Sequence, residues 1–424
     1  KKISLIFIFT LCSSIMIAQQ TPAKKQTTDI AIVGGTAHTG TGEIIENCIL
    51  IIRDGKIATI VDGSTVKLDL NGMEVIDANG KHLYPGFIIP NTTLGLVEIG
   101  AVRATDDDQE VGLYKPHVKS LIAYNAESKI VESMRPNGVL LGQITPRGGR
   151  IAGTSSIVQF DAWNWEDAVY KEDDGVHLNW YTMFNRWNGK ANKNYGERVE
   201  ELKEFFANAQ AYSKEDNYEE INLRFEAMRG VFSGKQTLFI HANFVKEITE
   251  AIDFGKKFDI KKMVIVGGYD AWRVSDMLKD NNVAVILRRV HELPIHEDDD
   301  VYLPYKLPKL LFDAGVLFCL ENSGDMETMG TRNLPFYAGT AAAYGIDKEE
   351  ALKLITLNTA KILGVDSTTG SLESGKDATL FISTGDALDV RTNNVIAAFI
   401  QGRLIDVDNH QKKLYRKYSE KYKN

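Results

Sequence analysis

The 424-residue sequence lacks the short motifs that mark several common enzyme classes. It has no Gly-x-Ser-x-Gly nucleophile elbow, no phosphate-binding P-loop and no Cys-x-x-Cys pair. These motifs expose a nucleophilic serine, cradle a phosphate and hold a metal or redox couple, so none of these chemistries has motif support here. Low-complexity tracts and short-period repeats are absent as well.

The chain has no excess of basic residues, since 49 Lys and Arg stand against 57 Asp and Glu, for a formal net charge of -8. This balance argues against a nucleic-acid partner. The content of 44% apolar and 25% charged residues is ordinary for a globular protein. A chain of this length suits a large barrel with a satellite domain better than one ordinary core.

Apolar runs long enough to span a membrane are missing. Two lysines precede about fifteen almost wholly apolar residues, whereas a bilayer needs roughly 20. Ala18 then precedes two glutamines. This pattern is typical of a secretory signal peptide. We therefore expect residues 1–18 to be removed and the mature protein to be exported, periplasmic or secreted, without a membrane span.

Cysteine is scarce, with three residues in the chain. Cys12 belongs to the expected signal segment, which leaves Cys48 and Cys319. An exported protein permits these two to pair. Both lie in apolar, strand-like runs, which favours two separate buried thiols.

The two ends of the remaining chain are rich in short strand patterns. Residues 27–84 contain apolar runs with the hairpin signal Asp54-Gly55 between two of them, and residues 367–408 contain two further runs. We expect both ends to form one discontinuous β-sandwich, followed by a charged helix over residues 409–424.

Between these ends, residues 85–366 alternate strands with helices. Strand patterns at 237–240, 263–266, 283–287 and 316–320 enclose helix patterns at 244–258, 270–279 and 305–314. The series predicts a parallel sheet, and a (β/α)8 TIM barrel is its commonest closed form. A doubly wound open sheet is the alternative, although the glycine-rich turn that it needs is represented only by Gly148-Gly149.

An expected insert over residues 161–196 holds four of the five tryptophans, namely Trp163, Trp165, Trp180 and Trp187. Two interpretations are open. The rings pack the insert onto the barrel, or Trp163 and Trp165 form an aromatic wall over the barrel mouth and contact a substrate. Helix patterns at 197–211 and 219–232 follow.

Polar residues that follow two of the strands are candidate substrate contacts. Asn91 and Thr93 come just after the apolar run 87–89, where parallel barrels carry their active sites. Arg147 follows the strand pattern 139–144. Its guanidinium either binds an anionic group or belongs to a plain turn.

The segments 75–88, 332–340, 356–364 and 370–378 together resemble the imidazolonepropionase-like branch of the amidohydrolase superfamily, and the likeness extends over nearly the full mature length. The resemblance implies a barrel with a split sandwich. It also implies hydrolysis of non-peptide C–N bonds, such as those of cyclic or small amides, by water bound to a divalent metal.

At most metal-ligand positions of this family the chain has other residues: Ile89, Asn91 and Thr93 for Asp-x-His-x-His on the first strand, Gly267-Gly268 for the sixth-strand histidine, and Ser323 for the eighth-strand aspartate. His241 keeps the fifth-strand position, and Asp325 lies two residues past Ser323. Since catalytic metal sites take at least three protein ligands, the resemblance leaves His241 and Asp325 as the expected catalytic or ligand residues.

The loop 288–300 is a candidate for a relocated site, because it holds two histidines and five carboxylates after the seventh expected strand. One interpretation is a solvated acidic loop. The other is a cation site, in which carboxylates suit calcium and histidines suit a transition metal such as zinc. Its candidate ligands are His241, His291 and Asp325, and His291 is also a candidate substrate contact.

Two functions are therefore open. The first is an amidohydrolase that acts on a small amide-like molecule through His241 and Asp325. The second is an inactive protein of the same fold that binds a ligand or a partner subunit, as a homo- or hetero-oligomer.

Overall fold

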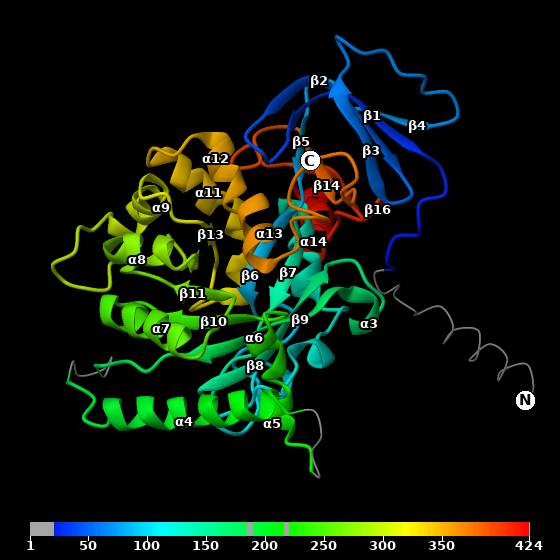
Figure 1. The fold of residues 1–424 in the computed structure, drawn as a ribbon. Coiled ribbons are helices and arrows are strands. Elements are labelled where there is room, and N and C mark those ends of the chain that lie inside the picture. Colours follow the sequence, from blue (N-terminus) through cyan, green and yellow to red (C-terminus); the bar gives the residue numbers. More distant parts are fainter. Residues whose placement is uncertain (1–20, 185–189, 216–219, 424) are drawn as a thin grey trace, which may run out of the picture.

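The computed structural model describes residues 21–184, 190–215 and 220–423. The expected signal segment and Trp187 lie outside these ranges. Within them, no helix is both long and apolar enough to cross a membrane. The described chain forms two eight-stranded sheets, one from the middle of the chain and one from both of its ends (Figure 1).

The barrel sheet follows the order of the sequence, and its strands are mostly buried. They are β6 (Phe87–Thr92), β7 (Val139–Ile144), β8 (Ile151–Gln159), β9 (Val169–Asn179), β10 (Thr237–Ala242), β11 (Met263–Gly267), β12 (Ala284–Leu287) and β13 (Phe318–Leu320). Residues 354–355 bridge the gap between β13 and β6, since their carbonyls accept the Leu320 and Ile88 amides at 3.1 and 2.9 Å. The expected barrel is confirmed in nearly closed form.

Helices cover the outside of the later strands, as their apolar spacing predicts. They are α7 (Val245–Lys257), η4 (Ala271–Val274), α8 (Ser275–Asp280), α9 (Leu303–Asp313), α11 (Leu334–Ala343), α12 (Lys348–Lys353) and α13 (Leu357–Leu363). Two short elements, α10 (Glu327–Gly330) and η5 (Thr331–Asn333), lie between β13 and α11 in the chain. In α7, for example, Ile248, Ala251 and Ile252 share one buried face. The helix patterns at 244–258, 270–279 and 305–314 are confirmed.

The first half of the barrel differs from the expectation. β8 is antiparallel to both of its neighbours, and the expected insert 161–196 contains the barrel strand β9. The first half of β9 carries Lys171, Glu172 and Asp173, and this polar run hid the strand pattern. The described residues between β7 and β8 form no helix, and this direct connection reverses the chain within the barrel.

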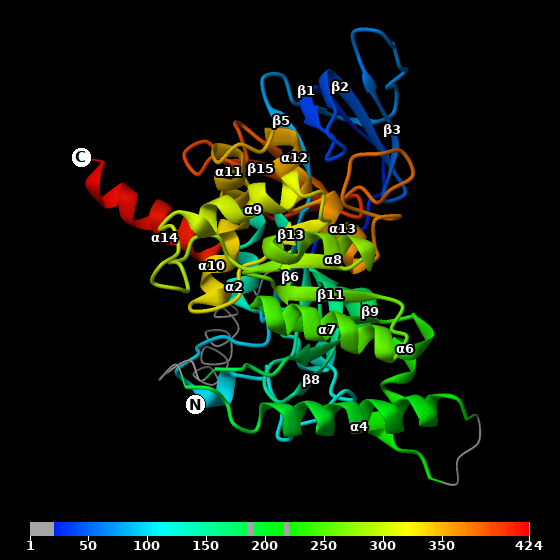
Figure 2. The same ribbon diagram turned by 60° about the vertical axis from the view of Figure 1, so that its left-hand side comes forward.

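Other helices lie around this half. α4 (Tyr195–Ser213) confirms the pattern at 197–211 and lies along one side of the barrel (Figure 2), whereas two short helices, α5 (Leu223–Glu226) and α6 (Arg229–Ser233), replace the one expected at 219–232. The remaining short elements are η1 (Arg103–Thr105), η2 (Ser120–Ala123), α2 (Lys129–Glu132), η3 (Arg135–Asn137) and α3 (Trp165–Ala168).

The second sheet combines strands from both chain ends, as expected. Its strands are β1 (Ile30–His38), β2 (Ile44–Arg53), β3 (Lys56–Asp62), β4 (Glu74–Asp77), β5 (His82–Pro85), β14 (Leu380–Ser383), β15 (Val395–Ile400) and β16 (Arg403–Ile405). The antiparallel pair β5 and β14 joins the two ends in one continuous sheet. Cys48 lies in the core of this sheet and Cys319 in β13, both as free buried thiols, as expected. The charged helix α14 (His410–Ser419), followed by η6 (Glu420–Tyr422), extends from the body (Figure 2).

A buried ion cluster joins the two sheets. Asp161, just past β8, accepts hydrogen bonds from Arg135 Nη1 at 3.2 Å, from Arg403 Nη1 at 2.9 Å and from the Ala23 amide at 2.9 Å. The side chains of Asp161 and Arg135 are only 2% and 5% exposed. One carboxylate therefore fixes the barrel to β16 and to the first described residues of the chain.

Candidate active site

A cavity of about 710 Å³ opens at the carboxyl ends of the barrel strands. Its wall comes from β6 and β10, from the loops that follow β6, β7 and β13, and from α10. The lining residues are Asn91, Thr93, Val97, Glu98, Ile99, Gly100, Asp108, Arg147, His241, Ser323, Gly324, Met326, Glu327, Thr328 and Met329. This is the end of a parallel barrel at which active sites form.

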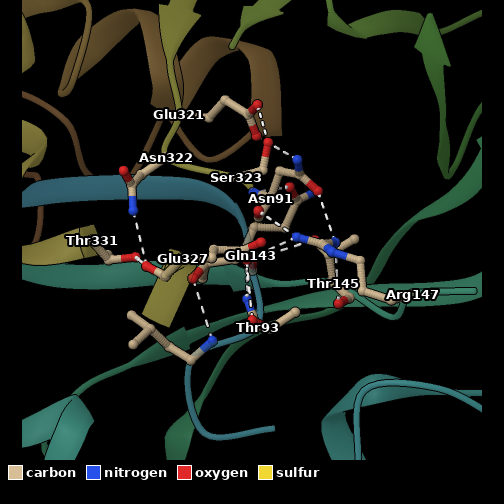
Figure 3. A network of polar contacts seen from close by, with 12 residues as sticks. Asn91, Thr93, Gln143, Thr145, Arg147, Glu321, Asn322, Ser323, Glu327 and Thr331 are labelled. Carbon is tan, nitrogen blue, oxygen red and sulfur yellow. Dashed lines mark hydrogen bonds and ion pairs between the residues drawn. The ribbon is translucent and has the colours of Figure 1, made fainter. Parts of the chain in front are cut away.

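Arg147 and Glu327 tie the rim of the cavity together (Figure 3). Arg147 donates to the Asn91 side-chain oxygen at 3.0 Å, to the Asn91 carbonyl at 2.9 Å and to Glu327 Oε1 at 2.9 Å. Glu327 Oε1 also accepts from the Thr93 amide at 2.8 Å. Asn91 has a φ of +50°, a conformation that non-glycine residues rarely adopt and that often accompanies functional sites.

Behind this rim lies Glu321, which is 1% exposed and follows β13. Its two carboxylate oxygens accept hydrogen bonds from the Asn91 side-chain amide and from the Ser323 hydroxyl (Figure 3). Burial raises the pKa of Glu321 to about 7, helped by the charge of Glu327 and opposed by these two hydrogen bonds and by Arg147. Glu321 therefore exchanges a proton near neutral pH.

A chain of hydrogen bonds ends at His241. The Ser155 hydroxyl donates to Asp174 Oδ1 at 2.7 Å, so the 2.9 Å contact between Ser155 and His177 requires His177 Nε2 to donate. Neutral His177 must then accept at Nδ1, from His241 Nε2 at 3.0 Å. This arrangement leaves the free lone pair of His241 on Nδ1.

Burial sets the protonation of this chain. The pKa of His241 falls to about 3 and that of His177 falls well below its ordinary value, chiefly by burial, with smaller contributions from the charge of Arg147. Burial raises the pKa of Asp174 to about 6 against hydrogen bonds from Ser155 and Gln143. At neutral pH the chain therefore holds two neutral histidines and a carboxylate.

Gln143 of β7 links the histidine chain to Glu321. Its side chain donates to Asp174 Oδ2 at 2.7 Å and accepts from the Asn91 amide at 3.0 Å. Asn91 in turn contacts Glu321. A single buried polar network thus crosses five neighbouring strands, β6 to β10, and reaches the loop after β13.

The buried carboxyl of Asp174 predicts a pH dependence of stability. Its pKa rises from 3.8 to about 6 on folding, so the folded protein holds an extra proton in this window, and stability is lost as the pH rises through it. We expect the free energy of unfolding of the wild type, relative to Asp174→Asn, to fall by roughly 2 kcal/mol between pH 4 and pH 7. Urea denaturation at several pH values measures this difference. A difference that stays constant with pH contradicts it.

The structure brings four of the predicted site residues together in one cavity: Asn91, Thr93, Arg147 and His241. Asp325 is exposed and does not line the cavity, and its main-chain carbonyl accepts a hydrogen bond from Arg289 at 2.8 Å. The carboxylate that lines the cavity from this loop is that of Glu327. His291 Nε2 lies 2.7 Å from the Thr340 hydroxyl, outside the lining.

The prediction that Trp163 and Trp165 form an aromatic wall over the barrel mouth is wrong. β8 reverses the chain, so that Gln159 lies opposite Leu141 near the start of β7, and residues 160–168 lie at the amino end of the strands. Trp163 is 63% exposed there, and Trp165 packs against the core. Trp180 is buried and donates to Tyr195. The packing interpretation holds for Trp165 and Trp180.

The predicted metal ligands His241, His291 and Asp325 are not assembled. In the ranges that the structure describes, no three His, Cys, Asp or Glu side chains gather closely enough to hold a metal ion. Several carboxylates of the loop 288–300 have other partners: Glu292 pairs with Arg288 and Arg289, Asp299 accepts from Tyr269, and Asp300 pairs with Lys306. The structure therefore favours the interpretation of this loop as an acidic, ion-paired loop. The described residues do not provide the ligands for the divalent metal that the family resemblance implies.

Sequence reasoning missed the buried half of the network, namely Gln143, Ser155, Asp174, His177 and Glu321. A signal existed for His177, which lies in the apolar alternation Gly175-Val176-His177-Leu178. The others are single polar residues within strands or, for Glu321, directly after one, and their partners lie up to 230 positions away in the sequence.

Comparisons with known proteins agree with this fold. The model of the amidohydrolase family matches residues 311–405. An amidohydrolase, tasK, of Hapsidospora irregularis is 26% identical over 74% of this chain, and imidazolonepropionase of Flavobacterium psychrophilum is 22% identical over 48% of it. The matches span only 36% and 58% of the length of these two relatives.

A solved structure extends the likeness over most of the chain. An amidohydrolase from Thermotoga maritima superimposes with a TM-score of 0.77 over 89% of this chain and 99% of its own, at 24% identity. That structural likeness shows the fold, and the family match covers the last barrel helices and the return into the second sheet. In fold, and in sequence over residues 311–405, the chain is similar to amidohydrolases.

Proposed function

We propose that the protein hydrolyses a C–N bond of a small or cyclic amide in the cavity at the carboxyl end of the barrel, using its own side chains as acid and base. The observation that carries the proposal is the placement of a neutral histidine and, behind the same wall, a carboxyl group that titrates near pH 7. We propose in addition that the chain is exported and that this activity lies in the periplasm or outside the cell.

Amide hydrolysis needs a proton acceptor for the attacking oxygen and a proton donor for the leaving nitrogen. Groups whose pKa lies near the working pH serve both roles best. Glu321, with a pKa of about 7, can take a proton and return it. His241 is neutral, and its Nδ1 lone pair accepts a hydrogen bond from the substrate or from water.

The charge of the cavity limits the substrate. Glu98, Asp108 and Glu327 line it together with one arginine, Arg147, whose guanidinium is engaged by Asn91 and Glu327. We therefore expect a neutral or cationic amide rather than an anionic one. The volume of about 710 Å³ suits a small molecule.

The test is a panel of cyclic amides and small linear amides, with amine or acid release measured by mass spectrometry. His241→Ala is expected to reduce turnover roughly 10- to 100-fold, the loss of one buried hydrogen-bonding group. His296→Ala, a histidine outside the cavity lining, is the control and should keep full activity. Activity that survives His241→Ala contradicts the role of this residue.

Chelation separates this proposal from metal hydrolysis. Because the described donor set does not assemble three metal ligands, we expect dialysis against a chelator to leave turnover unchanged. Loss of turnover that zinc restores would overturn it.

One observation favours a second function, binding without turnover. The polar groups of the wall already satisfy one another, since Arg147, Asn91, Glu321 and Glu327 form mutual hydrogen bonds. If the protein only binds its ligand, we expect amides of the panel to bind in calorimetry and to be recovered unchanged.

A further inference from the structure

We propose that Ser323 is a nucleophile at this site and that Glu321 is its general base, so that hydrolysis proceeds through an acyl-serine ester. The proposal rests on the proposed amide hydrolysis for its substrate class. It goes beyond that proposal by naming the attacking atom.

Ser323 combines two properties of a nucleophile. It lines the cavity, and its hydroxyl donates to Glu321 Oε1 (Figure 3). A serine hydroxyl becomes nucleophilic when an adjacent base accepts its proton, and that base is oriented by a third group. Here the third group is Asn91, which donates to the other oxygen of Glu321.

The backbone around this pair is held in rare conformations. Asn91 has a φ of +50°, and Met326, three residues past Ser323, has a φ of +58°. Arg147 and Glu327 secure both segments to each other. Such conformations persist where surrounding contacts over-determine them, and they cluster at reactive sites.

The reaction balances with water as the co-reactant. Ser323 Oγ forms a bond to the amide carbonyl carbon, and its proton passes to Glu321. The C–N bond then breaks, and Glu321 returns the proton to the leaving nitrogen. Water attacks the ester, its proton passes through Glu321 to Ser323 Oγ, and the acid leaves.

The chain contains a matched control. The Ser371 hydroxyl donates to Glu373, so this serine also contacts a carboxylate two residues away. That pair lies outside the cavity lining, and Lys376 contacts both members. A hydrogen bond to a carboxylate alone therefore does not single out Ser323, and the two serines should differ in reactivity.

The test is covalent labelling of the full chain with a fluorophosphonate, which phosphonylates activated serines. Intact-mass analysis should find one adduct, and peptide mapping should place it on Ser323 and not on Ser371. Ser323→Ala should lose the adduct while keeping the wild-type circular dichroism spectrum, and Ser371→Ala should label as the wild type does. An unlabelled wild-type chain, or an adduct on another residue, overturns the proposal.

The same experiment separates the two proposals. Labelling at Ser323 with no turnover of any panel amide supports the nucleophile and counts against amide hydrolysis. Full amide turnover by Ser323→Ala supports hydrolysis and overturns the nucleophile.

Discussion

Replacing Glu321 by glutamine is expected to lower kcat/KM by about 10²- to 10⁴-fold, the usual contribution of a positioned general base. Glutamine keeps the size of the side chain and one oxygen acceptor for the Ser323 hydroxyl. It cannot take up a proton. The loss therefore reports proton transfer rather than packing.

The pH profile makes this prediction sharper. A base is active in its ionised form, and burial raises the pKa of Glu321 to about 7, so wild-type kcat/KM should rise with pH and level off above this value. The residual activity of Glu321→Gln should lack this rise. Glu373→Gln makes the same change in a pair outside the cavity and should leave the profile intact. If kcat/KM of Glu321→Gln still rises near pH 7, the titrating group is not Glu321.

The rim of the site was predictable because it depends on short-range patterns. Asn91 and Thr93 follow an apolar strand at the end where parallel barrels carry their sites, and His241 stands at the same end of β10. Arg147 follows β7 in the same way, and it lines the cavity while donating to Asn91 and Glu327.

The interior of the site was not predictable because it depends on partners far apart in the sequence. Glu321 ends an apolar run, and nothing nearby indicates that Asn91 will face it. His177 required recognition of β9, whose polar first half masks the strand. The reversal at β8 likewise moved Trp163 to the opposite end of the barrel, where no substrate of this cavity reaches it.

The ion cluster around Asp161 gives the largest expected effect on stability. Asp161→Ala should lower the free energy of unfolding by roughly 3–5 kcal/mol, because it leaves the buried charge of Arg135 without its carboxylate. Burial already lowers the pKa of Arg135, and the charge of Asp161 is the main force that opposes this shift. The substitution also removes one of the acceptors of Arg403 and the side-chain acceptor of the Ala23 amide. Urea denaturation followed by circular dichroism measures the loss.

Two controls distinguish charge from packing in this cluster. Glu166→Ala removes an exposed carboxylate five residues away and should change stability by no more than about 0.5 kcal/mol. Combining Asp161→Ala with Arg135→Met removes both the carboxylate and the buried guanidinium that it neutralises. The double variant should therefore be more stable than Asp161→Ala alone. If the double variant is as unstable as the sum of its single variants, the two charges do not interact, and the barrel is held to β16 by the remaining contacts.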